Sequence, residues 1–403
     1  MGLKQKFGAI HWRHWLRKLC LLAAAAVIFC VGQAVGDGRL KIHRTHVIAT
    51  GLPDQLDYAT VNQLYQSLKN NYDGKLTANQ LLNGLKHGLA EATADPYTEY
   101  FTPKEAKSFS DQLNNAFSGI GAQLGADASG NLQVIAPIAG TPAAKAGLKP
   151  KDLIGTINDV STAGLSVDQA VGKIRGAAGT KVTLGIIRGS KAFTVTITRQ
   201  NITLPSVTTH MLAGNIGYMQ ISTFGDDTSR LAEQAAHKFV QAHVKGVILD
   251  LRENPGGLVD DAINVSSLWL PDGDTVVQTK GTTGNQTLTA IGGDVLHGIP
   301  TVVLIDGGSA SASEITTGAL HDNGAAYVIG VKSYGKGVEQ SLINFGDGSQ
   351  LKVTVASWFR PNGQNINHKG ITPDKVVQEP TSATALAAND AQLNAAKAYL
   401  ASH

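Results

Sequence analysis

The chain has 403 residues, enough for two or three domains with sizeable hydrophobic cores. Its formal net charge of +3 comes from the amino terminus, because the first 18 residues hold five basic residues and no acidic one. The remainder has 29 basic and 31 acidic residues, which argues against nucleic-acid binding. Both cysteines, Cys20 and Cys30, lie in one apolar segment, so disulfides and thiol chemistry are excluded for the rest of the chain.

The basic segment 1–18 precedes seventeen uncharged residues, Leu19 to Val35. This order is typical of a signal anchor or a signal peptide, which we place at 19–36. We expect an uncleaved anchor in the cell membrane, with residues 1–18 in the cytoplasm and the bulk of the chain on the extracytoplasmic side. The alternative is secretion after cleavage near Gly32-Gln33-Ala34, because seventeen residues are at the lower bound for a membrane-spanning helix.

Residues 37–104 are expected to form a linker followed by two helices. Gly36 to Pro53 is polar and irregular, whereas apolar residues recur at helical spacing from Leu56 to Ala92, with a break near Asp73-Gly74. The apolar faces of these helices can pack on the body of the chain or against a second subunit. The second arrangement makes them a candidate interface for a homo-oligomer.

A compact β-rich unit is predicted for residues 108–200, with strands at 132–135, 153–157, 182–187 and 193–198 and a helix from Ser166 to Ile174. The strings Gly119-Ile120-Gly121-Ala122 and PAAKAGL at 142–148 resemble a PDZ domain. In such domains the Gly-x-Gly loop offers backbone N–H groups to the terminal carboxylate of a peptide. A rigid spacer is the alternative. Arg175 is a candidate for coupling this unit to the following domain, or else an ordinary solvated arginine.

The following segment alternates strands and helices. Strands are predicted at 216–221 and 244–251, with a helix at 227–242 between them. The second strand runs into the string DLRENPGGL at 250–258, a tight turn with accessible backbone amides. On its own this string is an ordinary turn from a strand into a helix.

Ser311 stands at the start of a predicted amphipathic helix that follows a strand at Thr301–Ile305 and a break at Asp306-Gly307-Gly308. Free backbone N–H groups and the helix dipole favour negative charge at this position, so it suits an oxyanion. The S-x-x-E string from Ser311 to Glu314 is also a capping box, so helix capping is the alternative role.

Lys336 lies between two glycines after a predicted strand at 326–331. Flanking glycines permit unusual backbone angles, so the amine can turn inward. Burial among apolar groups lowers the pKa of a lysine and makes it a general base near neutral pH. A surface turn lysine is the alternative. A hairpin predicted at 340–345 and 350–358, joined by a turn at 346–349, would anchor this loop.

Two rival sites are set aside. The G-x-x-x-x-G-K string that ends at Lys336 is followed by Gly337, so the hydroxyl that holds magnesium in a P-loop is missing. His321 and Asp322 lie ten helical residues beyond Ser311, about 15 Å along the axis, which is too far for a hydrogen-bonded triad. Zinc-ligand spacings such as H-E-x-x-H are absent from the sequence, and no metal is expected.

The strings GSASASEI, GALHDNG and SYGKGVEQ together resemble the carboxyl-terminal processing peptidases, also called tail-specific proteases, of serine peptidase family S41. The resemblance extends over about residues 95–374. It implies Ser311 as nucleophile, Lys336 as general base and Gln340 as the residue that orients the lysine. It also implies that the N–H groups of Gly257 and Ala312 form an oxyanion hole.

The expected architecture is α/β and multidomain: an N-terminal helical segment, an inserted PDZ domain, an α/β serine-protease core at 201–380 and a helix at 381–403 of unassigned role. The expected activity is that of a serine endopeptidase, without a cofactor, on exported or membrane-proximal polypeptides recognised by their C-terminal ends. A non-catalytic peptide-binding scaffold is one alternative, which unsubstituted Ser311 and Lys336 disfavour. A small-ester hydrolase is the other, which the PDZ-like unit disfavours.

Overall fold

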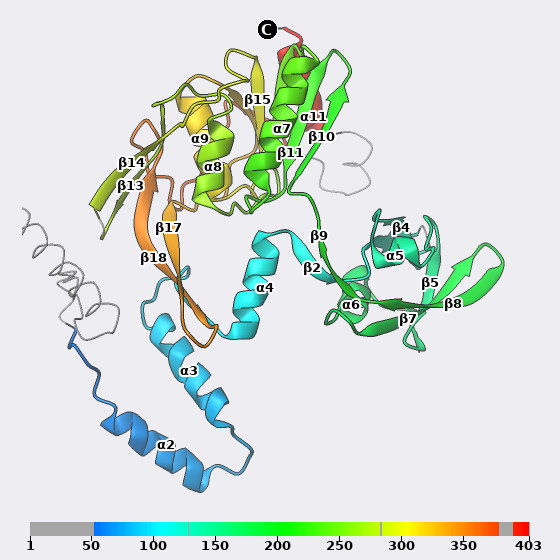
Figure 1. Ribbon diagram of the computed structural model, residues 1–403, viewed down its shortest axis with the longest axis vertical. Helices are drawn as coiled ribbons and strands as arrows, with labels where there is room; N and C mark the ends of the chain where they lie inside the picture. The colour runs from blue at the N-terminus through cyan, green and yellow to red at the C-terminus, as the bar shows by residue number, and fades with distance from the viewer. Residues whose placement is uncertain (1–51, 128, 283, 379–389, 403) are drawn as a thin grey trace, which may run out of the picture. The chain divides into compact units, whose positions relative to one another are not determined.

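The computed structural model describes residues 52–127, 129–282, 284–378 and 390–402 (Figure 1). The predicted anchor or signal segment at 19–36 lies outside the described residues. Among the helices in the described ranges, none has both the length and the apolar character needed to cross a membrane. The chain forms two compact units, Met1–Gly74 and Lys75–His403.

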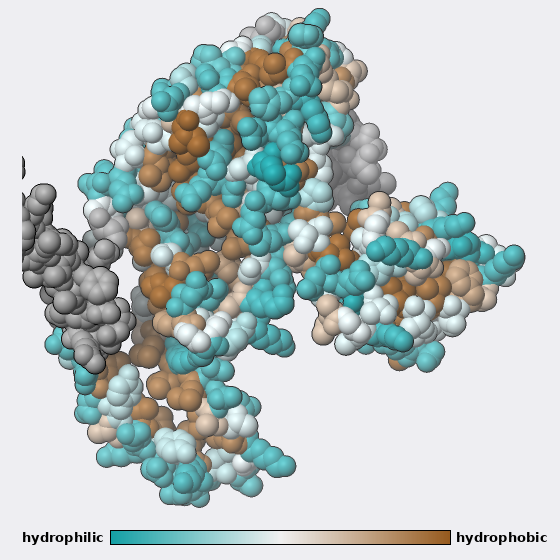
Figure 2. Space-filling view, viewed as in Figure 1, coloured by the Kyte–Doolittle hydropathy of each residue, from teal (hydrophilic) through white to brown (hydrophobic). Residues whose placement is uncertain are grey.

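The two predicted N-terminal helices are confirmed as α2 (Ala59–Asn71) and α3 (Ala78–Glu91). Helix α2 belongs to the first unit and buries none of its residues, with Leu64 61% exposed. Helix α3 begins the second unit with a capping box, in which Thr77 and Gln80 exchange hydrogen bonds. Apolar side chains remain at the surface of both helices (Figure 2).

A six-stranded sheet forms the centre of the α/β core. The strand order is β10-β11-β12-β15-β16-β19, and all neighbours are parallel except β10 and β11. The strands predicted at 216–221, 244–251, 301–305 and 326–331 are confirmed, and the middle ones are buried on both faces, as their continuous apolar runs require. The sheet consists of β10 (Val207–Leu212), β11 (Ile216–Ile221), β12 (Gly246–Asp250), β15 (Thr301–Ile305), β16 (Tyr327–Gly330) and β19 (Lys375–Val376).

Helices cover both faces of this sheet. On one face α7 (Thr228–Gln241), α8 (Val259–Ser266) and α9 (Ala312–Asp322) lie side by side over the larger hydrophobic cluster (Figure 1). On the other face α11 (Ala391–Leu400) packs against β12, β15 and β16, and its Ala396 and Leu400 join the smaller hydrophobic cluster there. Arg252 fixes α11 by pairing with both Asp250 and Asp390. The C-terminal helix, whose role the sequence left open, therefore completes the core.

A second, antiparallel sheet has the order β1-β18-β13-β14, with β17 paired to β18. The predicted hairpin is confirmed as β17 and β18, but the other three strands were not predicted. Residues Val276, Val277 and Trp358 of this sheet join the core cluster. Its strands are β1 (Glu99–Phe101), β13 (Thr275–Gly281), β14 (Gly284–Thr289), β17 (Val338–Asn344) and β18 (Gln350–Phe359).

The β-rich unit has its own hydrophobic cluster, which includes Val134, Ile154 and Leu184. Its four predicted strands and its helix are confirmed. The chain enters through β2 (Ala116–Gly119) and leaves through β9 (Gln200–Thr203), which pair with each other, Ser118 opposite Asn201. The elements are β3 (Ala122–Ala126), β4 (Leu132–Pro137), α5 (Pro142–Lys145), β5 (Leu153–Ile157), β6 (Val160–Ser161), α6 (Val167–Ile174), β7 (Lys181–Arg188) and β8 (Lys191–Thr198).

Both connections to the β-rich unit are pinned to one turn of the core. Asn114 accepts a hydrogen bond from the N–H of Asp226 at 3.3 Å, and the Asn115 amide donates to Ser222 at 3.3 Å. The backbone carbonyl of Asn115 also accepts from Leu204, at the end of the outgoing connection, at 3.0 Å. The turn 222–226 is therefore the part of the α/β core to which the β-rich unit is attached by hydrogen bonds.

Candidate active site

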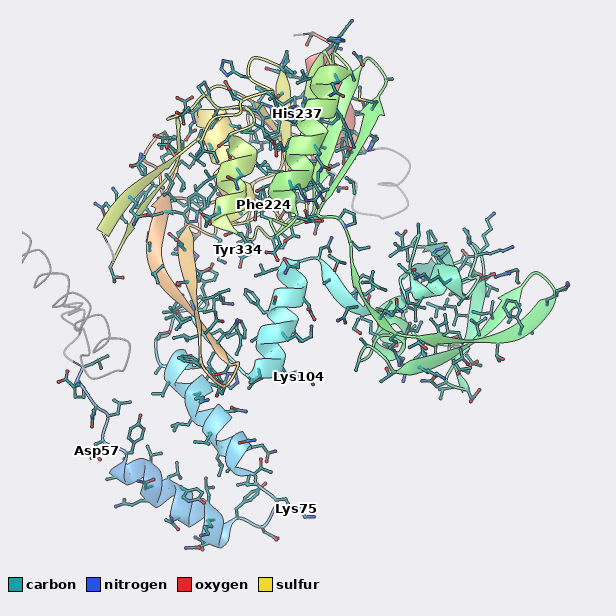
Figure 3. All side chains as sticks on the ribbon, in the orientation of Figure 1. Asp57, Lys75, Lys104, Phe224, His237 and Tyr334 are labelled. Carbon is teal, nitrogen blue, oxygen red and sulfur yellow. The ribbon has the colours of Figure 1, made fainter. Side chains whose placement is uncertain are left out.

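The candidate site lies where four neighbouring parallel strands end. Because β11, β12, β15 and β16 run in the same direction, the loops that follow them meet at one edge of the sheet. Figure 3 labels Phe224, which follows β11, and Tyr334, which follows β16, near this edge. The predicted nucleophile follows β15, the predicted oxyanion loop follows β12, and the predicted base follows β16.

Ser311 occupies a strained backbone position at the start of α9. Its φ is +54° and its ψ is −115°, a region that residues with a side chain rarely adopt. The residue is 8% exposed. The neighbouring loop packs tightly against it, since a Cβ on Gly256 would lie 2.7 Å from the Cβ of Ser311, so position 256 has no room for a side chain. The strand-to-helix turn thus presents Ser311 at the pocket surface at the cost of local strain.

Two backbone N–H groups beside Ser311 are free to bind an oxyanion. Those of Gly257 and Ala312 donate no hydrogen bond within the part of the chain that the structure describes. Gly257 has a φ of +146°, and a Cβ there would lie 2.0 Å from the carbonyl oxygen of Phe224, so only glycine fits. Asn254 holds this loop to α9, because its carbonyl accepts from Ser313 Oγ at 2.9 Å as well as from the N–H of Ala310 at 3.0 Å.

Glu314 joins Ser311 to the loop that carries Lys336, a link that was not predicted from the sequence. One carboxylate oxygen accepts from the N–H groups of both Ser311 and Lys336, each at 2.9 Å. The other accepts from Ser333 Oγ at 2.5 Å and from the N–H of Gly335 at 2.8 Å. Glu314 is fully buried, and this burial raises its pKa against four hydrogen bonds that favour the carboxylate.

Lys336 reaches the same pocket as Ser311. The pocket has a volume of about 310 Å³, and both residues line it. Burial lowers the pKa of Lys336, and the nearby Lys352 lowers it further, whereas Asp95 and Glu314 oppose the shift. This is the direction that a general base near neutral pH requires.

Gln340 lines the pocket but does not bond to the lysine. Its side-chain amide donates to Thr354 Oγ1 at 3.3 Å. Within the described ranges, Gln340 and Lys336 share no hydrogen bond, so the orienting role of Gln340 stays a prediction.

Helix α4 (Pro103–Leu113), which was not predicted, supplies one wall of the pocket through Phe109, Gln112 and Leu113. Its start carries a recognisable signal, because Thr102 and Glu105 form a capping box and Pro103 occupies the first turn. Apolar side chains from the other elements complete the wall: Leu258, Val259, Ile315, Val338, Leu342 and Trp358.

His321 and Asp322 lie away from the pocket, at the far end of α9. His321 bonds Asp322 and Asp374, each at 3.0 Å, and Arg360 pairs with Asp322. These four residues tie α9 to the segments that flank β18 and β19. This placement is consistent with the exclusion of a Ser-His-Asp triad from the sequence. Groups of acidic, histidine and cysteine residues able to hold a metal ion were not found among the described residues.

The loop 119–122 of the β-rich unit has the features of a carboxylate-binding loop. The N–H groups of Ile120 and Gly121 donate no hydrogen bond to described residues. Gly121 has a φ of +76°, and a Cβ there would lie 2.4 Å from that of Thr141, so glycine is required. Arg175 stacks on the ring of Phe117 in β2, with 5.3 Å between Cζ and the ring centroid. Its coupling role stays a prediction.

Comparison with known proteins identifies both parts of the chain. The profile of Peptidase family S41 matches residues 215–377, and that of the PDZ domain matches residues 108–187. A putative S41 protease from Bacteroides fragilis has a similar fold, with a TM-score of 0.56 at 15% identity over 87% of this chain and 99% of the other.

Two bacterial proteins show the similarity over most of the chain. Carboxy-terminal processing protease CtpA of Bacillus subtilis is 37% identical over 321 residues, 79% of this chain and 69% of that protein. A probable CtpA-like serine protease of Staphylococcus saprophyticus is 38% identical over 323 residues, 79% of this chain and 65% of that protein. The chain thus spans about two thirds of the length of these relatives.

Proposed function

Because the chain belongs to peptidase family S41 and carries a PDZ domain, we propose that this serine peptidase cleaves polypeptides with a Ser311–Lys336 dyad. The main observation in support is that Ser311 and Lys336 share the Glu314 carboxylate as a hydrogen-bond acceptor. This carboxylate brings together two residues 25 positions apart, since their backbone nitrogens each lie 2.9 Å from the same oxygen. Both side chains then enter one pocket.

The reaction is acyl transfer. The neutral amine of Lys336 accepts the proton of Ser311 Oγ as this oxygen attacks the peptide carbonyl. The N–H groups of Gly257 and Ala312 stabilise the oxyanion of the tetrahedral intermediate. Collapse breaks the C–N bond, the leaving amine takes the proton from Lys336, and water then hydrolyses the acyl-enzyme with Lys336 again as base.

Substrates are polypeptides recognised through their C-terminal ends. The free N–H groups of Ile120 and Gly121 are placed to bind a terminal carboxylate, and β3 offers an edge for an added peptide strand. The mostly apolar lining of the catalytic pocket favours apolar side chains near the scissile bond over charged ones.

The proposed location is the extracytoplasmic side of the cell membrane, with the segment 19–36 as anchor or cleaved signal. The support is the order of basic and apolar residues at the amino terminus. Association of two copies through the N-terminal helices is supported by the exposed apolar side chains of α2.

Cleavage of an unfolded polypeptide with an apolar C-terminus, by the chain from Arg39 to His403, tests the dyad. We expect Ser311→Ala and Lys336→Ala each to lower kcat/KM by roughly 1,000-fold or more, with folding intact by circular dichroism. Lys332→Ala is the matched control, an exposed lysine on the same loop, and should cleave as the parent does.

The other outcomes separate the alternatives. Peptide binding without cleavage by the parent chain would favour the non-catalytic scaffold. Hydrolysis of small esters with no cleavage of polypeptides would favour the ester hydrolase.

A further inference from the structure

The amine of Lys336 has no polar partner in the described part of the chain, neither a hydrogen bond nor an ion pair. The residue predicted to orient it, Gln340, donates its amide to Thr354. What the amine does contact is an aromatic ring, because Lys336 Nζ lies 5.3 Å from the ring centroid of Tyr97. A general base without a fixed partner would sample several rotamers and would often point away from the serine. The contact with the ring of Tyr97 is therefore a candidate for what holds the amine in place.

Tyr97 is held in place by a short turn that is fastened to the hairpin below the pocket. Asp95 accepts from the N–H of Tyr97 at 3.1 Å and from Thr98 Oγ1 at 2.7 Å. Thr98 in turn accepts from the N–H of Thr354, in β18, at 3.2 Å. The ring of Tyr97 is therefore anchored to the same strand that Gln340 bonds.

We infer that Tyr97 is a positioning residue for the proposed reaction, and that the face of its ring holds the Lys336 amine in the pocket. The face of a phenol ring carries negative electrostatic potential and attracts an ammonium group within about 6 Å. The same face accepts the weaker N–H contact of a neutral amine. Tyr97 thus contacts the amine in both protonation states. The inference rests on the proposed role of Lys336.

Several charged groups surround this contact. Lys352 of β18 disfavours the ammonium form of Lys336, and Asp95 and Glu314 favour it. The hydroxyl of Tyr97 faces Tyr334, and burial raises the pKa of Tyr97, so the ring stays neutral over the working range of pH. Burial lowers the pKa of Lys336. The ring face of Tyr97 acts in the opposite direction, because it stabilises the ammonium form of Lys336.

The test compares Tyr97→Leu, which removes the ring, with Tyr97→Phe, which removes only the hydroxyl. The first measurement is the pH profile of kcat/KM for polypeptide cleavage. The second is the rate at which acetic anhydride labels the Lys336 amine at each pH, read by mass spectrometry, which needs no catalysis. Thermal unfolding shows whether each variant is folded.

For Tyr97→Leu we expect kcat/KM to fall by about tenfold or more, and the titration of Lys336 to move down by about half to one pH unit in both measurements. Tyr97→Phe should stay within about threefold of the parent, with the parent titration. An unchanged titration in the leucine variant would overturn the inference. So would an upward shift, which would show that Tyr97 only excludes water, or an equal loss in the phenylalanine variant.

The two measurements also separate this inference from the proposed function. If Lys336→Ala still cleaves polypeptides, the proposed dyad fails, whereas the labelling of Lys336 continues to report whether the ring holds the amine. If the dyad is supported and labelling is unaffected by Tyr97→Leu, only the role of Tyr97 fails.

Discussion

At the scale of single residues, the site depends on Glu314 as much as on the two residues that it joins. Its carboxylate satisfies four donors that belong to α9 and to the loop after β16. Bonds to a charged group are worth about 1.5–3 kcal/mol each, and a donor left unpaired in a buried site costs a comparable amount. Losing this acceptor should therefore separate Ser311, the proposed nucleophile, from Lys336, the proposed base.

We predict that Glu314→Gln lowers kcat/KM by at least tenfold, because an amide nitrogen replaces one acceptor oxygen and meets N–H groups that also donate. Stability to urea should fall by about 2 kcal/mol or more. The control is Glu233→Gln, on the exposed side of α7, which should change neither quantity. Full activity in Glu314→Gln would mean that the dyad assembles without this link.

Ser311, Lys336 and Gly257 could be singled out from the sequence as candidates because they stand in recognisable strings, and the structure brings all three to one pocket. Glu314 was visible only as the partner in a capping box, since nothing in its own neighbourhood shows that Ser333 and Gly335 come within bonding distance. Tyr97 is 239 positions from Lys336 in the sequence, and only the tertiary fold brings the two together.

At the scale of elements, the core strands followed from their apolar runs, because a strand buried on both faces has a clear sequence pattern. Strands β13 and β14, which were not predicted, show why the antiparallel sheet was harder to predict from the sequence. Only part of β13 is buried, and the first four residues of β14 are exposed, so hydrophobic periodicity is weak. Helix α4 was missed although its capping box was present, since polar residues fill most of its length.

The anchoring of α9 gives a prediction on pH. Burial opposes the charge on His321, but hydrogen bonds to Asp322 and Asp374 prevail and raise its pKa, with Arg360 acting against them. A raised pKa in the folded state means stability that is complete below the unfolded value of about 6.5 and is lost as pH rises through the folded value.

We therefore expect the part of the unfolding free energy that depends on His321 to decrease as the pH rises above the unfolded pKa of about 6.5. Urea denaturation at several pH values measures it, and His321→Asn should remove this part of the slope. His237→Asn, at an exposed histidine of α7, is the matched control and should leave the slope unchanged. A slope that survives in His321→Asn would place the titrating group elsewhere.

At the scale of the whole molecule, the PDZ domain is an insertion whose incoming and outgoing strands, β2 and β9, pair with each other. Its hydrophobic cluster shares no residue with those of the peptidase core. The two connecting strands pair directly, with Ser118 opposite Asn201. Joining these two residues by a two-residue Asn-Gly turn should close the core without distortion.

We predict that the chain with residues 119–200 replaced by Asn-Gly still folds, with one cooperative unfolding transition. It should lose preference for substrates with a free C-terminal carboxylate over amidated ones, because the loop that carries Ile120 and Gly121 is gone. Competition between the two peptides measures this preference in the parent and in the shortened chain. An unchanged preference would place the tail receptor outside the PDZ domain.

The junction at Asn114 and Asn115 has a mechanical consequence. Both connections are fastened to the turn 222–226, and Phe224 in this turn bonds to the loop that carries the Gly257 amide. A force applied to the PDZ domain by a long, partly folded substrate would thus be transmitted through this turn to the proposed oxyanion hole. A pull on the substrate tail would then shift the backbone amide that is proposed to polarise the scissile carbonyl.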